Sequence, residues 1–478
     1  MIMDQIQKIC FRSSKCRKQI ALLLFLAVIL GVPACAPAGE DFPHPESKEG
    51  VLTYAALNPL TPTQKRYIFN FNNKHPDAQI EVLDYSDEGG VERLLTELTL
   101  GWVPDIIELH RIKTDDRDWA YMGTSEGEYQ MPYQQMARKG YLEDLWPYIE
   151  NDPELGRDAL LETPMKAAEV DGGLYMLFKE VFINTLIGET SVVGERDGWT
   201  IDELMETFAA AMPEESTILQ KSATRREMYD KLYCTTLDQY IDWETGKCSF
   251  DNDEFRGMLE FLSAFPTEYK TDIINKYELE KDAACWILDG KQMLQSIFVS
   301  DLWHISQMDK SFGRERISCV GYPTTDGSSG SFFNIPGTIL AMSSVCQDKE
   351  AAWEFMSYLV RPSASWTSLA QTSPRYLPVN RKDYEVGISL DMRDSSKSKI
   401  PLYFYQGGPN IFPDPPMKED ILRFEMLINN TKQIYWPNEA LSDTVWDAIG
   451  PYFAGDKTLD ETIQLVQNRV TLYVNENR

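Results

Sequence analysis

The sequence has few of the residues that build metal centres and disulfide frameworks. Its 478 residues include 8 Cys and only 4 His, and no two cysteines have the Cys-x-x-Cys spacing of a zinc site. Positive charge is scarce as well, since 46 Lys and Arg face 74 Asp and Glu, a formal net charge of -28 at pH 7. A charge of this sign repels nucleic acid and anionic lipid surfaces. We therefore expect no metal, no cofactor and no nucleic-acid partner.

Several catalytic motifs are missing or stand out of context. No G-x-x-x-x-G-K-[ST] sequence is present, so ATP hydrolysis would belong to a partner chain. Gly123–Gly127 matches the G-x-S-x-G pattern of serine hydrolases, with His304 as the base that the triad order requires, but no apolar strand precedes it. Asp251–Phe255 lacks the ligand spacing and glycine of an EF-hand loop and indicates a helix start. These observations argue against an enzyme, although paired carboxylates for glycoside hydrolysis stay open in so acidic a chain.

The one long apolar run lies near the first residue. Ile20–Val32 is shorter than the about 20 residues that span a bilayer, and it follows the basic residues Lys8, Arg12, Lys15, Arg17 and Lys18. This order is typical of an export signal that is removed. Val32–Cys35 resembles the lipobox of bacterial lipoproteins, which implies acylation of Cys35 and a membrane anchor of at least two acyl chains. The alternative is an ordinary secretory signal with an incidental cysteine.

Residues 1–34 are thus expected to be a lipoprotein signal peptide. Residues 35–49 are rich in proline and glycine with almost no apolar side chains, which predicts a flexible tether. The cysteines that remain are odd in number, so at least one thiol stays unpaired within a monomer. They are Cys234, Cys248, Cys285, Cys319 and Cys346, and their pairing is open.

From residue 51 to residue 109 the chain alternates between strand and helix patterns. Val51–Leu57, Gln79–Tyr85 and Pro104–Leu109 are short apolar runs typical of strands. Thr61–Pro62 is a cap and first-turn pair that opens a helix, and Val91–Leu98 repeats leucine and valine at helical spacing. This order predicts a parallel sheet covered on both faces, in which ligands sit beyond the carboxyl ends of the strands.

Other motifs have plain structural interpretations. Thr200–Glu203 and Thr458–Glu461 fit capping boxes, in which a threonine hydroxyl and a glutamate carboxylate satisfy free amide groups at a helix start. Lys349–Pro362 indicates a helix that ends near the proline. Ile463, Val466, Val470 and Tyr473 form an apolar stripe on the last helix, which we expect in the core.

A series of segments along the chain carries a family resemblance. They are FNNKHPDAQIEV (Phe71–Val82), LLTELTLGWVPDIIEL (Leu94–Leu109), KGYLEDLWPYI (Lys139–Ile149), DGGLYMLF (Asp171–Phe178), GWTIDEL (Gly198–Leu204), LDGKQML (Leu288–Leu294), GYPTTDG (Gly321–Gly327) and KEAAWEFMSYL (Lys349–Leu359). In this order they resemble the extracellular solute-binding proteins of bacterial ABC importers, in the carbohydrate branch that includes maltose-binding-like proteins. The chain departs from that family in residues 112–138, a longer aromatic and polar insert whose role is open.

The resemblance implies an α/β fold of two lobes, the type II periplasmic-binding-protein fold, with a mainly parallel sheet flanked by helices in each lobe and a hinged cleft between them. The chain would cross between lobes near Leu177, Asn334 and Ser373. The expected lobes are residues 50–177 with 335–373, and residues 178–334 with 374–478.

The same resemblance implies a function. The chain would be a lipid-anchored monomer on the extracytoplasmic face of the cell membrane that captures a sugar or oligosaccharide and delivers it to ABC permease subunits. A secreted, lipid-anchored hydrolase that acts on glycans is the alternative.

Three candidate ligand-binding residues come from the strand pattern. Asn58 follows the first strand, and His110 and Arg111 follow the third, at the sheet edge where ligands bind. For His110 an ordinary surface histidine is the competing interpretation.

Five further candidates come from the resemblance. Sugars expose CH faces that stack on aromatic rings and hydroxyls that bond to polar groups, and 11 Trp and 23 Tyr offer such rings. Glu180 and Phe182 follow the first crossing, Trp303 matches a position at which the family often places a stacking ring, and Tyr376 and Trp436 lie in later segments that border the cleft. An ion pair with neighbours of Lys179 competes for Glu180, and a buried core position competes for Trp303.

Overall fold

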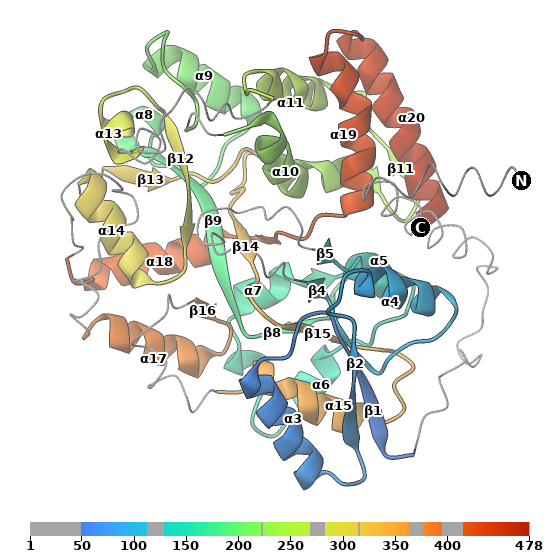
Figure 1. Ribbon diagram of the computed structural model, residues 1–478. Helices are drawn as coiled ribbons and strands as arrows, with labels where there is room; N and C mark the ends of the chain where they lie inside the picture. The colour runs from blue at the N-terminus through green and yellow to red at the C-terminus, as the bar shows by residue number, and fades with distance from the viewer. Residues whose placement is uncertain are drawn as a thin grey trace, which may run out of the picture.

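The structure is a computed structural model that describes residues 49–111, 129–220, 223–267, 283–313, 316–362, 376–393 and 414–477. Two sheets organise these residues (Figure 1), one in the lower half of the view and one in the upper left. The expected signal peptide, Cys35, nearly all of the tether, Gly123–Gly127 and Ser373 lie outside the described residues.

The first sheet has five strands in the order β2-β1-β3-β15-β8. Strand β1 (Val51–Ala56) pairs in parallel with β2 (Gln79–Asp84) and β3 (Ile106–Glu108), as the sequence predicts. Helices α3 (Pro62–Lys74) and α4 (Gly90–Thr99) join these strands. The Thr61 hydroxyl accepts the Gln64 amide at 3.2 Å, which confirms the predicted cap.

The second sheet has six strands and is centred on β9 (Glu180–Glu189). Its order is β12-β9-β14-β17, and β13 and β16 also pair with β9. These strands are β12 (Leu294–Val299), β13 (Ile317–Cys319), β14 (Phe332–Asn334), β16 (Leu377–Pro378) and β17 (Gln433–Ile434).

The expectation of mainly parallel sheets is wrong for the second sheet. Among the described residues, all four partners of β9 are antiparallel to it, and only β14 and β17 pair in parallel. In the first sheet β15 (Ile339–Met342) is likewise antiparallel to β3 and to β8 (Leu177–Phe178). The path of the chain explains this pairing. The chain leaves the first sheet after β8 and returns to it at β15 through a neighbouring link. The two strands before and after the links therefore run in opposite directions, β8 against β15 and β9 against β14.

Two described links carry the chain between the sheets, and they lie side by side. The first is Lys179 alone, between β8 and β9. The second is residues 335–338, between β14 and β15. Phe182 pairs with Asn334 on one side of the links, and Phe178 pairs with Ile339 on the other. The division of the chain into lobes at these links and at residue 373 stays a prediction.

Short ladders and 3-10 turns complete the strands. The ladders are β4 (His110–Arg111) with β5 (Tyr129–Gln130), β6 (Glu169–Val170) with β7 (Gly173–Leu174), and β10 (Ile241–Asp242) with β11 (Lys247–Cys248). The turns are η1 (Arg157–Ala159), η2 (Leu237–Tyr240) and η3 (Ser357–Leu359).

The other helices of the described residues surround the two sheets (Figure 1). They are α5 (Tyr133–Arg138), α6 (Trp146–Asn151), α7 (Glu162–Ala167), α8 (Thr190–Val193), α9 (Ile201–Ala211), α10 (Arg225–Thr236), α11 (Asp253–Ser263), α13 (Ala283–Leu288), α14 (Leu302–Phe312), α15 (Lys349–Met356), α17 (Arg381–Asp391), α18 (Lys418–Asn430), α19 (Glu439–Phe453) and α20 (Leu459–Asn477).

The helix predictions are confirmed. Thr200 and Glu203 form the capping box of α9, and Asn252 rather than a calcium loop starts α11. Helix α15 continues into η3 and ends before Pro362. On α20, Ile463, Val466 and Val470 are fully buried, while Tyr473 packs against the same cluster partly buried.

Strand β9 separates two hydrophobic clusters because alternate residues of a strand point to opposite faces. Ile183 and Ile187 belong to the cluster that also contains the core of the first sheet. Leu186 belongs to the other cluster, under α10, α11, α19 and α20. Glu180 and Phe182 point to the same side as Leu186, at the end of β9 nearest the links between the sheets.

Candidate ligand-binding site

Asn58 and His110 meet at the carboxyl ends of β1 and β3, as the strand pattern predicts. The carboxylate of Glu108 accepts the backbone amides of Leu57 at 2.7 Å and Asn58 at 3.0 Å. Burial raises the pKa of Glu108, and these hydrogen bonds oppose the rise. The Asn58 side-chain amide donates to the carbonyl oxygen of His110 at 2.7 Å, so the two loops are held together.

We call Asn58, His110 and Arg111 the strand-end group. Arg111 connects this group to the end of β2, and Trp436 connects it to the second sheet. Arg111 donates to the carbonyl oxygen of Ser86, beyond the end of β2, at 3.1 Å. Trp436 follows β17 of the second sheet, and its ring centroid lies 6.4 Å from that of His110. Its indole nitrogen donates to the Met131 carbonyl at 2.9 Å, and its ring meets Tyr133 edge-on at 5.1 Å. Trp436 therefore joins the second sheet to the segment that leads into α5.

Glu180, Phe182 and Tyr376 come together beside the links between the sheets. Strand β16 pairs with the start of β9, which places the ring of Tyr376 5.7 Å from that of Phe182. Burial raises the pKa of Glu180, while the charge of Lys179 lowers it. Burial and the charge of Glu180 together raise the pKa of Tyr376 to about 12. The three side chains form a half-buried group with two rings and one carboxylate.

A row of rings continues from this group to the start of α14. The Phe182 ring lies 5.9 Å from that of Phe298 on β12, and the Phe298 ring lies 5.0 Å from that of His304. We call Tyr376, Phe182, Phe298 and His304 the ring row. Asp301 caps α14 and lies 3.0 Å from the Nδ1 atom of His304, which fixes the imidazole.

Trp303 stands next to this row but is almost wholly buried. Its side chain is 2% exposed, and its backbone amide donates to Asp301 at 3.1 Å. The Nε1 atom of Trp303 has no hydrogen-bond partner in the part of the chain that the structure describes. A role for this ring in ligand binding stays a prediction, and so do the roles of the other candidate residues.

Asn334 is a residue that the sequence analysis named only as a crossing point. It ends β14, directly opposite Phe182, so both side chains lie on one face of the sheet. Its Nδ2 atom is buried and lacks a hydrogen-bond partner among the described residues. The sequence signal is weak, since one asparagine follows SFF before Ile-Pro-Gly. Its position beside Phe182 becomes visible only when the sheet is assembled.

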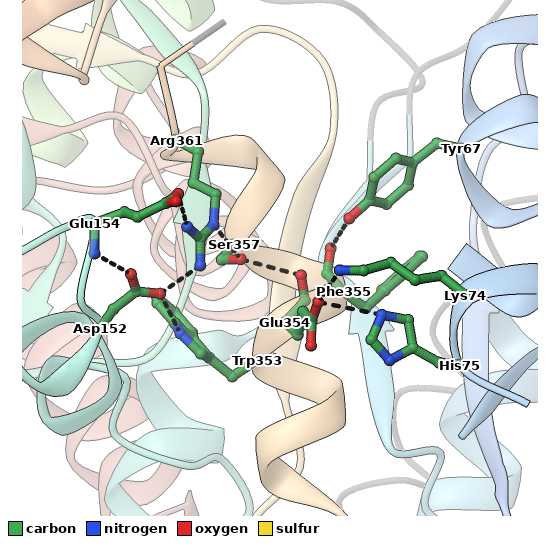
Figure 2. Close-up of polar contacts among 10 residues, drawn as sticks. All are labelled: Tyr67, Lys74, His75, Asp152, Glu154, Trp353, Glu354, Phe355, Ser357 and Arg361. Carbon is green, nitrogen blue, oxygen red and sulfur yellow. Dashed lines mark hydrogen bonds and ion pairs between the residues drawn. The ribbon is translucent and has the colours of Figure 1, made fainter. Parts of the chain in front are cut away.

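A concave region lies at the opposite end of the first sheet, where its parallel strands begin, and holds none of the candidate residues. It is a surface groove of about 600 Å³ between the end of α3 and α15. Two cations at this groove are paired with carboxylates (Figure 2). Arg361 lies 2.6 Å from Asp152, which also accepts the indole N–H of Trp353 at 3.0 Å. Lys74 lies 2.7 Å from Glu354 and ties α3 to α15. These contacts fasten elements of the scaffold.

Neither a metal cluster nor a membrane-spanning helix appears within the described ranges. No group of three His, Cys, Asp or Glu side chains there could hold a metal ion. No helix in those ranges combines the length and the apolar character needed to cross a bilayer. Cys248, Cys319 and Cys346 carry free thiols.

Comparisons with known proteins find the fold and little sequence similarity. No family model and no curated protein matches the chain. Among solved structures, the sugar-binding protein MalE from Xanthomonas citri superposes with a TM-score of 0.52 at 14% identity, over 89% of this chain and 97% of that one. A periplasmic oligogalacturonide-binding protein from Yersinia enterocolitica gives 0.52 at 14%, over 90% and 100%.

A putative oligosaccharide periplasmic-binding protein from Synechococcus sp. MITs9220 gives a TM-score of 0.50 at 13% identity, over 89% of this chain and 99% of that one. The two-lobed type II fold expected from the sequence is therefore confirmed. At such low identity the likeness concerns the fold.

Proposed function

We propose that this chain is the substrate-binding protein of an ABC importer. It captures a sugar or oligosaccharide outside the cytoplasm and delivers it to permease subunits, held to the membrane through lipids on Cys35. It binds its ligand and leaves it chemically unchanged. The proteins of similar fold are named for binding sugars, oligogalacturonides and oligosaccharides.

The ring row is the observation that carries this proposal. Rings drawn from β9, β12, α14 and the segment before β16 gather on the second sheet, next to the links that join it to the first. A pyranose offers CH groups on its faces and hydroxyls around its edge, so it needs aromatic area with a few polar groups beside it. Glu180 supplies a carboxylate acceptor at the end of the row, and Asn334 supplies an amide donor.

The strand-end group faces the ligand from the first sheet in this proposal. Asn58, His110 and Arg111 follow the carboxyl ends of the strands, where ligands of α/β sheets bind. Trp436 connects this edge to the second sheet through Met131 and Tyr133. A sugar held between the two groups would contact both lobes and favour their closed arrangement.

A thermal-shift screen of the purified chain against mono- and oligosaccharides tests the proposal. A ligand at about 100 times its Kd stabilises the fold by about 2.7 kcal/mol. Phe182→Ala should abolish the shift, whereas Phe69→Ala, at a ring 65% exposed on α3, should keep it. The recovered sugar should be intact. The proposal is wrong if no sugar stabilises the protein. It is also wrong if each protein molecule cleaves about one sugar molecule per second or more, and in that case the hydrolase alternative replaces it.

A further inference from the structure

The groove between the end of α3 and α15 has the size of a ligand-binding site, and the proposed function makes no use of it. We call it the α3–α15 groove. Its volume of about 600 Å³ lies within the range of about 300 to 1,000 Å³ that is usual for such sites. Its apolar lining consists of Pro76, Ala78, Pro153, Ala351 and Trp353. A surface of this shape can receive a segment of another molecule.

The lysine and the arginine that line the groove are bound within the protein (Figure 2). Lys74 lies 2.7 Å from Glu354. Arg361 lies 2.6 Å from Asp152 and 2.5 Å from Glu154. Neither cation is left to neutralise a further carboxylate. The other charges of the groove therefore decide which molecules it attracts.

Three carboxylates remain at the groove, those of Asp77, Asp348 and Glu350. All three residues are exposed, and none has an ion-pair partner among the described residues. Asp348 accepts the amide of Ala351 at 3.0 Å as the cap of α15, which leaves its negative charge in place. The whole chain is acidic, but here the carboxylates line one concave surface, so a single bound segment can meet all of them.

The groove lies where the chain enters the first sheet. The backbone of Gly50, directly before β1, lies against that of Asp77, and its carbonyl oxygen accepts the amide of Gln79 at 2.8 Å. Gly50 is the fifteenth residue after Cys35, and an extended chain of this length spans about 50 Å. In the lipoprotein proposal the groove thus stays within about 50 Å of the membrane, at the end of the sheet away from the strand-end group.

The tether that precedes Gly50 has the wrong charge for the groove. Residues 36–48 contain Glu40, Asp41 and Glu46 but only one lysine, Lys48. Like charges that meet at a binding surface repel each other. The occupant that complements the groove therefore comes from another molecule and carries positive charge.

Lysine and arginine side chains match both features of the groove. Their hydrocarbon stems pack on apolar surface, while their charged heads reach water and carboxylates. We propose that the α3–α15 groove binds a segment rich in lysine and arginine from a partner protein at the membrane. The stems lie on the apolar lining, and the heads meet Asp77, Asp348 and Glu350.

This inference goes beyond the proposed function. All residues that line the groove belong to the first of the expected lobes, and none belongs to the candidate ligand-binding site. The partner therefore binds whether the lobes are open or closed, and it leaves the sugar in place.

A titration with short peptides tests the groove. The probe is an octapeptide of alternating lysine and serine with blocked ends, and the same peptide with glutamate in place of lysine is the charge control. Isothermal titration of the purified protein at about 50 mM salt should show binding of the lysine peptide that weakens as the salt concentration rises. The glutamate peptide should not bind.

A groove variant locates the site on the protein. It combines Asp77→Asn, Asp348→Asn and Glu350→Gln, in which asparagine at 348 keeps the cap of α15. We expect this variant to bind the lysine peptide about tenfold more weakly, because each exposed ion pair contributes little alone but three are lost together.

A second variant with the same change of net charge is the matched control. It combines Glu206→Gln, Glu214→Gln and Glu215→Gln, at exposed residues on and directly after α9, at the opposite end of the molecule (Figure 1). This variant should bind the lysine peptide as the native protein does.

Three results would refute the groove as a docking site. The lysine peptide does not bind, or both variants weaken its binding equally, which would mean that net charge alone attracts it. Preferred binding of the glutamate peptide would favour an acidic occupant such as the tether and overturn the proposal as well. No step of the test uses a sugar, so its failure leaves the proposed function intact.

Discussion

At the scale of the residue, the environment of Glu180 departs clearly from that of a surface carboxylate. It begins β9 one residue after the link from the first sheet, and its neighbours there are the rings of Phe182 and Tyr376. Burial raises its pKa. A carboxylate in such a position is poorly hydrated, and it is therefore available as an acceptor for a ligand hydroxyl that replaces the lost water.

The raised pKa of Glu180 predicts a pH dependence of stability. Between the pKa in the unfolded chain, about 4.3, and the higher pKa in the folded protein, the folded state binds more protons, so stability falls as the pH rises through this window. Glutamine cannot ionise, so the Glu180→Gln variant does not lose stability in this way as the pH rises. Urea unfolding at several pH values between about 4 and 7 should show the variant gaining stability relative to the native protein as the pH rises.

Glu354 provides the opposite case as a control. A hydrogen bond from Lys74 lowers the pKa of Glu354. The contribution of Glu354 to the stability of the folded protein is therefore present above the pKa of the unfolded chain and is lost as the pH falls. Glu354→Gln should therefore lose stability near neutral pH and little at low pH, and the effect should be small because the pair is exposed to solvent. Parallel curves for Glu180→Gln and the native protein would show that Glu180 ionises in the folded state as it does in the unfolded chain.

At the scale of the element, the helix starts are fixed by side chains that the sequence displays openly. The hydroxyl of Thr200 accepts the amide of Glu203 at 3.2 Å, and the carboxylate of Glu203 accepts the amide of Thr200 at 2.9 Å. Each bond satisfies an amide that has no partner within α9. The start of this helix is thus determined within four residues of sequence.

Removing this cap should destabilise the protein measurably. Thr200→Ala deletes the hydroxyl acceptor, and we expect a loss of about 1 kcal/mol in the free energy of unfolding by urea. Thr207→Ala is the control on the same helix, because its hydroxyl bonds only to the Glu203 carbonyl within the helix and alanine is the better helix former. Equal stabilities of the two variants would mean that the capping box contributes nothing.

Elements set by local patterns were predictable from the sequence, and those set by distant pairing were not. Strands β1 to β3 and helices α3 and α4 follow from periodicity, a proline and a cap. Strands β16 and β17 are two residues long and acquire their identity only from partners far along the chain. For the same reason the antiparallel second sheet escaped prediction.

The candidate site divides along the same line. Strand ends placed Asn58 and His110 together, and the family resemblance selected Glu180, Phe182 and Tyr376, which the structure brings into one group. The amide of Asn334 could not be anticipated, because its neighbour Phe182 lies about 150 residues earlier in the chain and the pairing of β9 with β14 decides which side chains share a face.

At the scale of the whole molecule, the proposed attachment to the membrane rests on one cysteine. In the lipoprotein proposal Cys35 is the acylated residue, and no other thiol lies within Val32–Cys35. Cys35→Ser should leave the precursor without lipid, and the protein should move from the membrane fraction to the soluble fraction. Fractionation followed by intact-mass measurement checks this. Retention of the processed Cys35→Ser variant in the membrane would contradict the anchor.

The proposed function also requires the two lobes to open and close around a ligand, and we expect Trp436 to influence that motion. It follows β17 of the second sheet, yet its indole nitrogen donates to Met131 and its ring packs on Tyr133. A hydrogen bond of this kind contributes about 1 kcal/mol. If the contact belongs to the closed arrangement, its loss changes the ratio of closed to open molecules by about fivefold.

Trp436→Phe keeps a ring in contact with Tyr133 and removes the donor to Met131. X-ray scattering should show a smaller radius of gyration for the native protein with a bound sugar than without one, because the ligand favours closure. The variant should be more expanded without ligand, and it should bind about fivefold more weakly while reaching the same compact form at saturation, because closing the lobes then costs more free energy.

Trp446→Phe is the control, since that ring packs on Tyr229 within the second cluster. A Trp436→Phe variant with native scattering and native affinity would mean that this contact persists, or is absent, equally in both arrangements of the lobes.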